Sequence, residues 1–139
     1  MKILGIDFGT KRVGLAIGDS ELRVAAGLGV IEYKGQKAFI EQLHDVVKDE
    51  RIGLVVIGLP RNMNGSEGKG AETTRRIAEL IQTGLNVNVE FVDERLTTMQ
   101  ATRQLHLGDG KVGKSKGKID MMSAILILQT YLDRLQARS

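Results

Sequence analysis

The chain opens with Lys2-Ile3-Leu4-Gly5-Ile6-Asp7-Phe8-Gly9-Thr10, a nearly continuous apolar run. Such a run is typical of a strand that is buried on both faces of a sheet. Asp7 is the exception, because a buried carboxylate must be hydrogen-bonded, paired or bound to a cation. A local role is the simplest interpretation, since Asp and Gly at a strand end often form a turn. Asp7 gains a chemical role only if other acids converge on it.

A second strand follows directly and has one face almost without side chains. Large residues alternate in it with small ones, in the order Val13, Gly14, Leu15, Ala16, Ile17, Gly18. The small face predicts that another element of the fold lies close against this strand. The short connection to the first strand predicts an antiparallel hairpin.

The remaining hydrophobic patterns predict alternating helices and strands. We expect a third strand at an edge over 24–33, helices over 36–50 and 71–83, strands over 53–58 and 87–92, a short helix from Thr97 or Thr98 to Leu105, and a last helix over 119–135. This order predicts a mixed sheet that is antiparallel at first and joined later by right-handed crossovers. The length predicts one domain over residues 1–139.

Composition restricts the class of protein. The chain has no cysteine, which excludes a disulfide framework and a thiolate metal site and fits a cytoplasmic protein. Because the N-terminus leads directly into a predicted strand and no apolar run is long enough to span a membrane, we expect neither a signal peptide nor membrane association. A net charge of +3 does not by itself indicate nucleic-acid binding, because the clustering of the lysines matters more.

Further acids stand at unusual positions in the chain. Asp93 and Glu94 end an apolar strand, and Asp120 opens an apolar helix. Neighbouring strand residues point to opposite faces, so only one of Asp93 and Glu94 can point with Asp7, and the periodicity leaves open which one. Each acid alone has an ordinary explanation: Asp120 is favourable to the helix dipole, and the other acid can pair with Arg95 or cap a helix.

Together these acids predict a metal site. Carboxylates that are packed together repel one another unless a cation lies between them, and such hard oxygen ligands suit Mg²⁺ or Mn²⁺. Metal between carboxylates and phosphate oxygens is the arrangement that hydrolyses a phosphodiester. The basic loop over 108–118 would supply phosphate contacts, although a charge run alone can be a solvated loop.

Four motifs resemble those of the YqgF/RuvX family: Asp7-Phe8-Gly9-Thr10-Lys11-Arg12-Val13-Gly14; Gly58-Leu59-Pro60 with Asn62-Met63-Asn64-Gly65; Asp93-Glu94-Arg95-Leu96-Thr97-Thr98; and Lys116-Gly117-Lys118 with Asp120 and Ser123-Ala124. They occur in the family's order and cover nearly the whole chain. The resemblance implies an α/β, ribonuclease H-like fold with a mixed five-stranded sheet of order 3-2-1-4-5, whose second strand is antiparallel, flanked by helices. It also implies a bacterial, cytoplasmic nuclease that matures the 5′ end of pre-16S ribosomal RNA.

The resemblance also implies roles for individual residues. Asp7, Glu94 and Asp120 would be the catalytic acids that bind Mg²⁺ or Mn²⁺, with Asp93 and Ser123 beside them. Related RuvC resolvases carry a further acid where this chain has Ser123, so the resemblance leaves one or two metal ions open. Contacts to nucleic acid are expected from Lys11, Arg12, Arg61, Arg95, Lys111, Lys114, Lys116 and Lys118.

Other functions remain open at this stage. A Holliday-junction resolvase acting on branched DNA would need two active sites and therefore a homodimer. An RNA-binding ribosome assembly factor would bind without cleaving. ATP handling of the sugar-kinase and actin kind is disfavoured because it needs a second lobe. Tyr33 and Tyr131 are the plausible base-stacking residues and both are expected to pack, which favours structured RNA recognised through its backbone.

Overall fold

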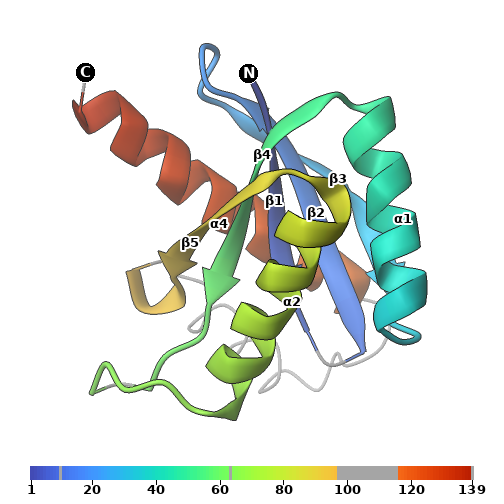
Figure 1. Cartoon of the computed structure of the whole chain (residues 1–139). Coiled ribbons are helices and arrows are strands. Elements are labelled where there is room, and N and C mark those ends of the chain that lie inside the picture. The colour runs from blue at the N-terminus through green and yellow to red at the C-terminus, as the bar shows by residue number, and fades with distance from the viewer. Residues whose placement is uncertain (10, 63, 97–115, 139) are drawn as a thin grey trace.

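The computed structural model describes residues 1–9, 11–62, 64–96 and 116–138 (Figure 1). Its elements are β1 (Lys2–Phe8), β2 (Arg12–Asp19), β3 (Ala25–Glu32), α1 (Gln36–Asp49), β4 (Ile52–Leu59), α2 (Lys69–Leu85), β5 (Asn88–Asp93), the short 3₁₀ helix η1 (Glu94–Leu96) and α4 (Lys116–Arg138). The strands and long helices lie within about three residues of the predicted bounds. The short helix expected up to Leu105 and most of the basic loop lie outside the described residues.

One boundary was predicted wrongly. Lys116, Gly117 and Lys118 open α4, whereas the sequence pattern placed them in the preceding loop. A glycine inside a helix costs only about 1 kcal/mol, which a long, well-packed helix outweighs. Two of the predicted basic residues therefore stand on a helix rather than on a loop.

The predicted sheet order is confirmed as β3-β2-β1-β4-β5. β1 pairs antiparallel with β2 and parallel with β4, and β4 pairs parallel with β5. The central strand β1 thus ends beside β4, and β5 ends on the far side of β4. Acids that end β1 and follow β5 are separated by one strand.

Helices cover both faces of the sheet (Figure 1). On one face α1 and α2 pack on β1 and β4 through a cluster that includes Phe39, Ile77 and Ile6. On the other face α4 packs through a cluster that includes Ile3 and Leu128. Complete burial of such side chains contributes about 1.5–3 kcal/mol each, so both faces hold the fold together. Among the described helices, none is both long and apolar enough to cross a membrane.

The nearly bare face of β2 lies against α4, as its small residues predict. A Cβ atom added to Gly14 would collide with the carbonyl oxygen of Asp120, and one added to Gly18 would lie 3.1 Å from side-chain carbons of Leu128 and Leu132. Gly14 leaves no room for a side chain because the helix backbone approaches the strand directly, and the space at Gly18 is tight. This close approach fixes the part of α4 around Asp120 over the end of the β1–β2 hairpin.

Candidate active site

Asp7 lies at the end of β1, on the face that α4 covers. It pairs with Gly14 across the hairpin, and residues directly opposite in an antiparallel pair share one face. That face of Gly14 is the one on which Asp120 lies. Asp7 is only 1% exposed, so its carboxylate is withdrawn from solvent beneath the start of α4.

Glu94 lies at the same end of the same face. It begins η1 directly after β5 and is 4% exposed. A Cβ atom on Gly58 would lie 3.0 Å from Glu94 Oε1 and would also collide with Ile127 of α4. Gly58 is next along β4 after Ile57, the partner of Ile6 in β1, so Asp7 and Gly58 end adjacent strands. The carboxylate of Glu94 therefore lies over the end of β4, toward β1.

Asp120 is held by a cation from the hairpin. Its Oδ2 accepts a hydrogen bond of 3.0 Å from Arg12 Nε, and both side chains are partly buried. Ser123, one turn further along α4, is 1% exposed on the side that packs on the sheet. Asp7, Glu94 and Asp120 thus share one end of one sheet face. The described residues nevertheless include no group of three His, Cys, Asp or Glu side chains arranged to hold a metal ion, and Asp120 pairs with Arg12 instead.

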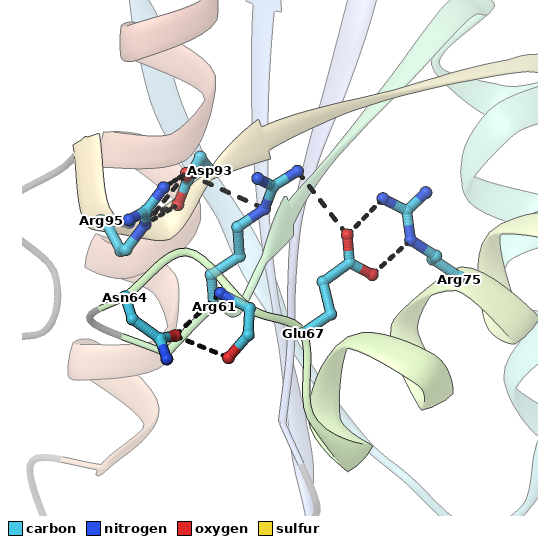
Figure 2. Close-up of polar contacts among 7 residues, drawn as sticks. Arg61, Asn64, Glu67, Arg75, Asp93 and Arg95 are labelled. Atoms are coloured by element: carbon cyan, nitrogen blue, oxygen red, sulfur yellow. Dashed lines mark hydrogen bonds and ion pairs between the residues drawn. The ribbon is translucent and has the colours of Figure 1, made fainter.

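Asp93 belongs to an ion-pair network (Figure 2). Its carboxylate accepts hydrogen bonds from the guanidinium group of Arg95, at 2.8 Å from Nη2, and from the Arg95 backbone N–H at 2.9 Å. Arg61 Nε lies 3.9 Å from Asp93, and Arg61 Nη2 lies 3.6 Å from Glu67, which accepts two hydrogen bonds of 2.7 Å from Arg75. The network joins the β4–α2 loop, α2 and the start of η1, and so it braces the backbone on both sides of Glu94.

Sequence reasoning missed two members of this network, Glu67 in the β4–α2 loop and Arg75 on α2. Glu67 and Arg75 stand eight residues apart across a helix start, where neither helix nor strand spacing indicates a pair. Arg75 also lies over the ring of Phe91, 5.1 Å from its centroid. Their pairing holds the pKa of Glu67 below its usual range, chiefly through the hydrogen bond from Arg75.

The substitution Asp93→Asn should make the free energy of unfolding less dependent on pH. The hydrogen bond from the Arg95 side chain, followed by its backbone N–H and the charges of Arg95 and Arg61, holds the pKa of Asp93 below the ordinary 3.8. The unfolded chain therefore binds the proton more readily than the folded protein does. The stability that the charged Asp93 contributes is present above pH ~4 and is lost as the pH falls through the pKa of Asp93 in the folded protein. We expect the variant to unfold more easily at pH 7, by about 1 kcal/mol or less because the pair is partly solvated.

Urea unfolding of both proteins between pH 7 and pH 3 measures this difference. Asparagine keeps an oxygen for the backbone N–H of Arg95 and removes only the charge. The two stabilities should converge at the acid end of the range. A constant difference at every pH would contradict the linkage of Asp93 to Arg95 and Arg61.

The predicted nucleic-acid contacts fall into three groups. Lys11 is exposed on the hairpin beside the three acids. The guanidinium groups of Arg12, Arg61 and Arg95 contact acids of the chain itself. Lys111 and Lys114 lie outside the described residues, as do the side chains of Lys116 and Lys118.

Residues 1–134 match the RuvX family, which is described as Holliday junction resolvase. The chain belongs to this family. A RuvX relative from Dictyoglomus thermophilum is 44% identical over 96% of both chains, and one from Streptococcus mutans is 43% identical over 97% of this chain and 99% of its own. Both carry the name "Putative pre-16S rRNA nuclease".

Solved structures show the same fold at low identity. Thermus thermophilus RuvC in complex with a Holliday junction substrate matches with a TM-score of 0.57 and 15% identity, over 99% of this chain and 95% of that chain. The fowlpox virus resolvase in complex with Holliday junction DNA matches with a TM-score of 0.56 and 13% identity, over 97% of this chain and 99% of that chain. The ribonuclease H-like fold implied by the sequence motifs is thereby confirmed for this RuvX member.

Proposed function

We propose that this RuvX member is a metal-dependent nuclease that hydrolyses phosphodiester bonds of structured RNA, and that it matures the 5′ end of pre-16S ribosomal RNA in the bacterial cytoplasm. One observation supports the proposal: Asp7 and Glu94, two buried acids that are distant in sequence, lie at the same end of the sheet face that is covered by α4, the helix that bears Asp120. The names of relatives that are about 40% identical over their full length support the substrate.

The donor chemistry of this site fits Mg²⁺ or Mn²⁺. Asp7 and Glu94 are almost completely buried at one end of the sheet face that α4 covers. Carboxylate oxygens are the ligands that both ions prefer. When bound, an ion of this kind would lower the pKa of a water molecule and stabilise the charge on the leaving oxygen. Asp7, Glu94 and Asp120 would hold it.

Arg12 has a defined part in this proposal. In the structure it neutralises Asp120, the acid on the helix that faces Asp7. A guanidinium group also binds phosphate oxygens in a bidentate manner. We expect the substrate backbone to compete for Arg12, which would release the carboxylate of Asp120 toward the other two acids. Assembly of the site would then be coupled to the arrival of substrate.

The family description favours branched DNA as the second candidate substrate. One purified preparation should be given a pre-16S leader RNA and a four-way DNA junction, with Mg²⁺ and with Asp7→Asn as the control. We expect cleavage at the 5′ end of the mature RNA sequence and none of the junction. Cleavage of the junction alone, by a homodimer, would favour the resolvase. Salt-dependent binding of RNA without any metal-dependent cleavage would overturn the nuclease proposal and favour an RNA-binding ribosome assembly factor.

A further inference from the structure

A cavity of about 390 Å³ opens at the same end of the sheet as the acids, on the opposite face. It is lined by Phe8, Gly9, Tyr33, Pro60, Lys69, Gly70 and Thr73. Its volume lies in the range of small-molecule sites, about 300–1,000 Å³. Its residues come from β1, the segment after β3, the β4–α2 loop and the first turns of α2. Phe8, Gly9 and Pro60 belong to the motifs quoted above, whereas Tyr33, Lys69, Gly70 and Thr73 lie outside them.

Two aromatic rings form one side of this cavity. Tyr33 and Phe8 meet edge to face with their centroids 5.1 Å apart, and each also packs on Phe39. The backbone N–H of Tyr33 donates to the carbonyl oxygen of Lys11 at 2.8 Å, which ties this ring to the hairpin that carries Asp7 and Arg12. Tyr33 remains half-buried, so it is a fixed aromatic surface that still reaches solvent. Such surfaces stack nucleobases of any sequence.

The polar side of the cavity favours a phosphate. Lys69 is the one charged residue among those that line it, and it forms no ion pair with any residue in the described ranges. Lys69 and Gly70 also begin α2, whose N-cap Gly68 makes no side-chain cap, so the positive end of the helix dipole adds to the lysine charge. An apolar aromatic wall with a cationic rim complements a nucleotide, which presents a flat base and an anionic phosphate.

The cavity is continuous with the acid site along the chain. Phe8 and Gly9 directly follow Asp7, and Pro60 follows Gly58 by two residues. Because neighbouring residues of a strand point to opposite faces, Asp7 faces α4 while Phe8 faces the cavity. A nucleic-acid strand that crosses the ends of β1 and β4 would therefore meet the acids on one face and the cavity on the other.

We propose that this cavity binds one unstacked nucleotide of the substrate strand, with its base on Tyr33 and its phosphate on Lys69. This inference rests on the proposed nuclease function, which it deepens by giving the enzyme a pocket for a nucleotide next to the scissile bond. Recognition would then require a strand that can release a base from its helix, such as the single-stranded leader of a precursor RNA. It revises the expectation that Tyr33 only packs in the core.

Ring signals of the two tyrosines allow a direct test without cleavage. Protein labelled with ¹³C in its tyrosine rings is titrated in EDTA with adenosine 5′-monophosphate, adenosine and ribose 5-phosphate. Tyr131 lies on α4, where its hydroxyl donates to Glu90, and serves as the internal control after assignment with Tyr131→Phe. We expect adenosine 5′-monophosphate to shift the Tyr33 signals with a Kd on the order of 1 mM, and each of the other two compounds to bind more weakly.

Matched variants separate the pocket from general charge effects. Lys69→Ala should reduce the affinity for adenosine 5′-monophosphate to that for adenosine, whereas Lys48→Ala, which removes the same charge from the far end of α1, should change nothing. In cleavage assays Lys69→Ala and Tyr33→Ala should raise KM about tenfold with little change in kcat. Tyr33→Phe keeps the ring and should behave like the wild type.

The outcomes distinguish this pocket from the nuclease proposal. Tyr33 signals that stay unchanged at several times the expected Kd, or equal shifts of Tyr33 and Tyr131, would overturn the pocket whether or not the protein cleaves RNA. A shift of Tyr33 in EDTA that persists in Asp7→Asn supports the pocket even if no substrate is cut. An unchanged KM in both Lys69→Ala and Tyr33→Ala would show that no substrate nucleotide enters the cavity.

Discussion

Asp7→Asn is expected to lower kcat for RNA cleavage about 10³-fold at saturating Mg²⁺. A bound metal contributes several kcal/mol to stabilising the transition state, and each 1.4 kcal/mol corresponds to a factor of ten in rate. Asparagine has nearly the same shape as aspartate but lacks the charge that would hold the ion. Single-turnover kinetics with the pre-16S leader measure the effect. Asp45→Asn, which removes an exposed carboxylate on α1, is the matched control and should cleave like the wild type.

The same substitution should leave the folded protein intact. Asp7 is 1% exposed, and asparagine keeps the shape of its side chain, so circular dichroism in EDTA should show a folded variant. Mg²⁺ should raise the Tm of the wild type, because a ligand that binds only the folded state stabilises it, and should raise that of the variant less. If the variant cleaves at the wild-type rate, or gains as much stability from Mg²⁺ as the wild type does, Asp7 does not belong to the metal site.

Gly14→Ala should have the second large effect, on stability and on activity. The added Cβ atom would meet the carbonyl oxygen of Asp120, a backbone atom that can move only with the surrounding turn of α4. Forcing extra atoms into a well-packed region costs about 1–3 kcal/mol, and we expect the upper end here because backbone meets backbone. Since a displacement of about 1 Å at a catalytic group can cost about 10²-fold in rate, kcat should fall by a similar factor.

Gly84→Ala is the control for this substitution. Gly84 lies near the end of α2, and a Cβ atom there would make ordinary contact with Ile40 at 3.5 Å. This variant should be as stable as the wild type or more stable, by up to about 1 kcal/mol, because alanine favours the helix. Urea unfolding of the three proteins provides the comparison. Equal stability of Gly14→Ala and Gly84→Ala would show that α4 does not rest on β2 in the way the structure describes.

Local pattern was sufficient to predict the strands and helices and the close contact at β2. The apolar runs of β1 and β4 indicated buried strands, and the alternation of small residues in β2 indicated the close contact that α4 makes at Gly14 and Gly18. The short hairpin and the later alternation of helices and strands predicted a mixed sheet that is antiparallel at first, whereas its strand order, which the structure confirms, came from the resemblance to the YqgF/RuvX family. The elements and the contact at β2 depend on periodicity and on short connections, which a single sequence contains.

The side-chain arrangement of the site could not be predicted in the same way. The chain leaves the strand geometry after Asp93, so a period of two does not carry over to Glu94, and only the packing beside Gly58 distinguishes the two acids. The pair of Arg12 and Asp120 joins residues 108 positions apart. The cavity at Tyr33 is assembled from four separate segments. Contacts of this kind arise from the tertiary fold and leave no local spacing in the sequence.

Binding of Mn²⁺, followed through the electron paramagnetic resonance signal of the free ion, tests the proposed metal site most directly. It should be measured for the wild type and for Asp7→Asn, Glu94→Gln and Asp120→Asn, with a short RNA that cannot be cleaved present so that Arg12 can engage phosphate. We expect each substitution to weaken Mn²⁺ binding at least about tenfold, because each removes a charged ligand. Equal binding of Mn²⁺ by the wild type and all three variants would contradict a metal site built from these acids.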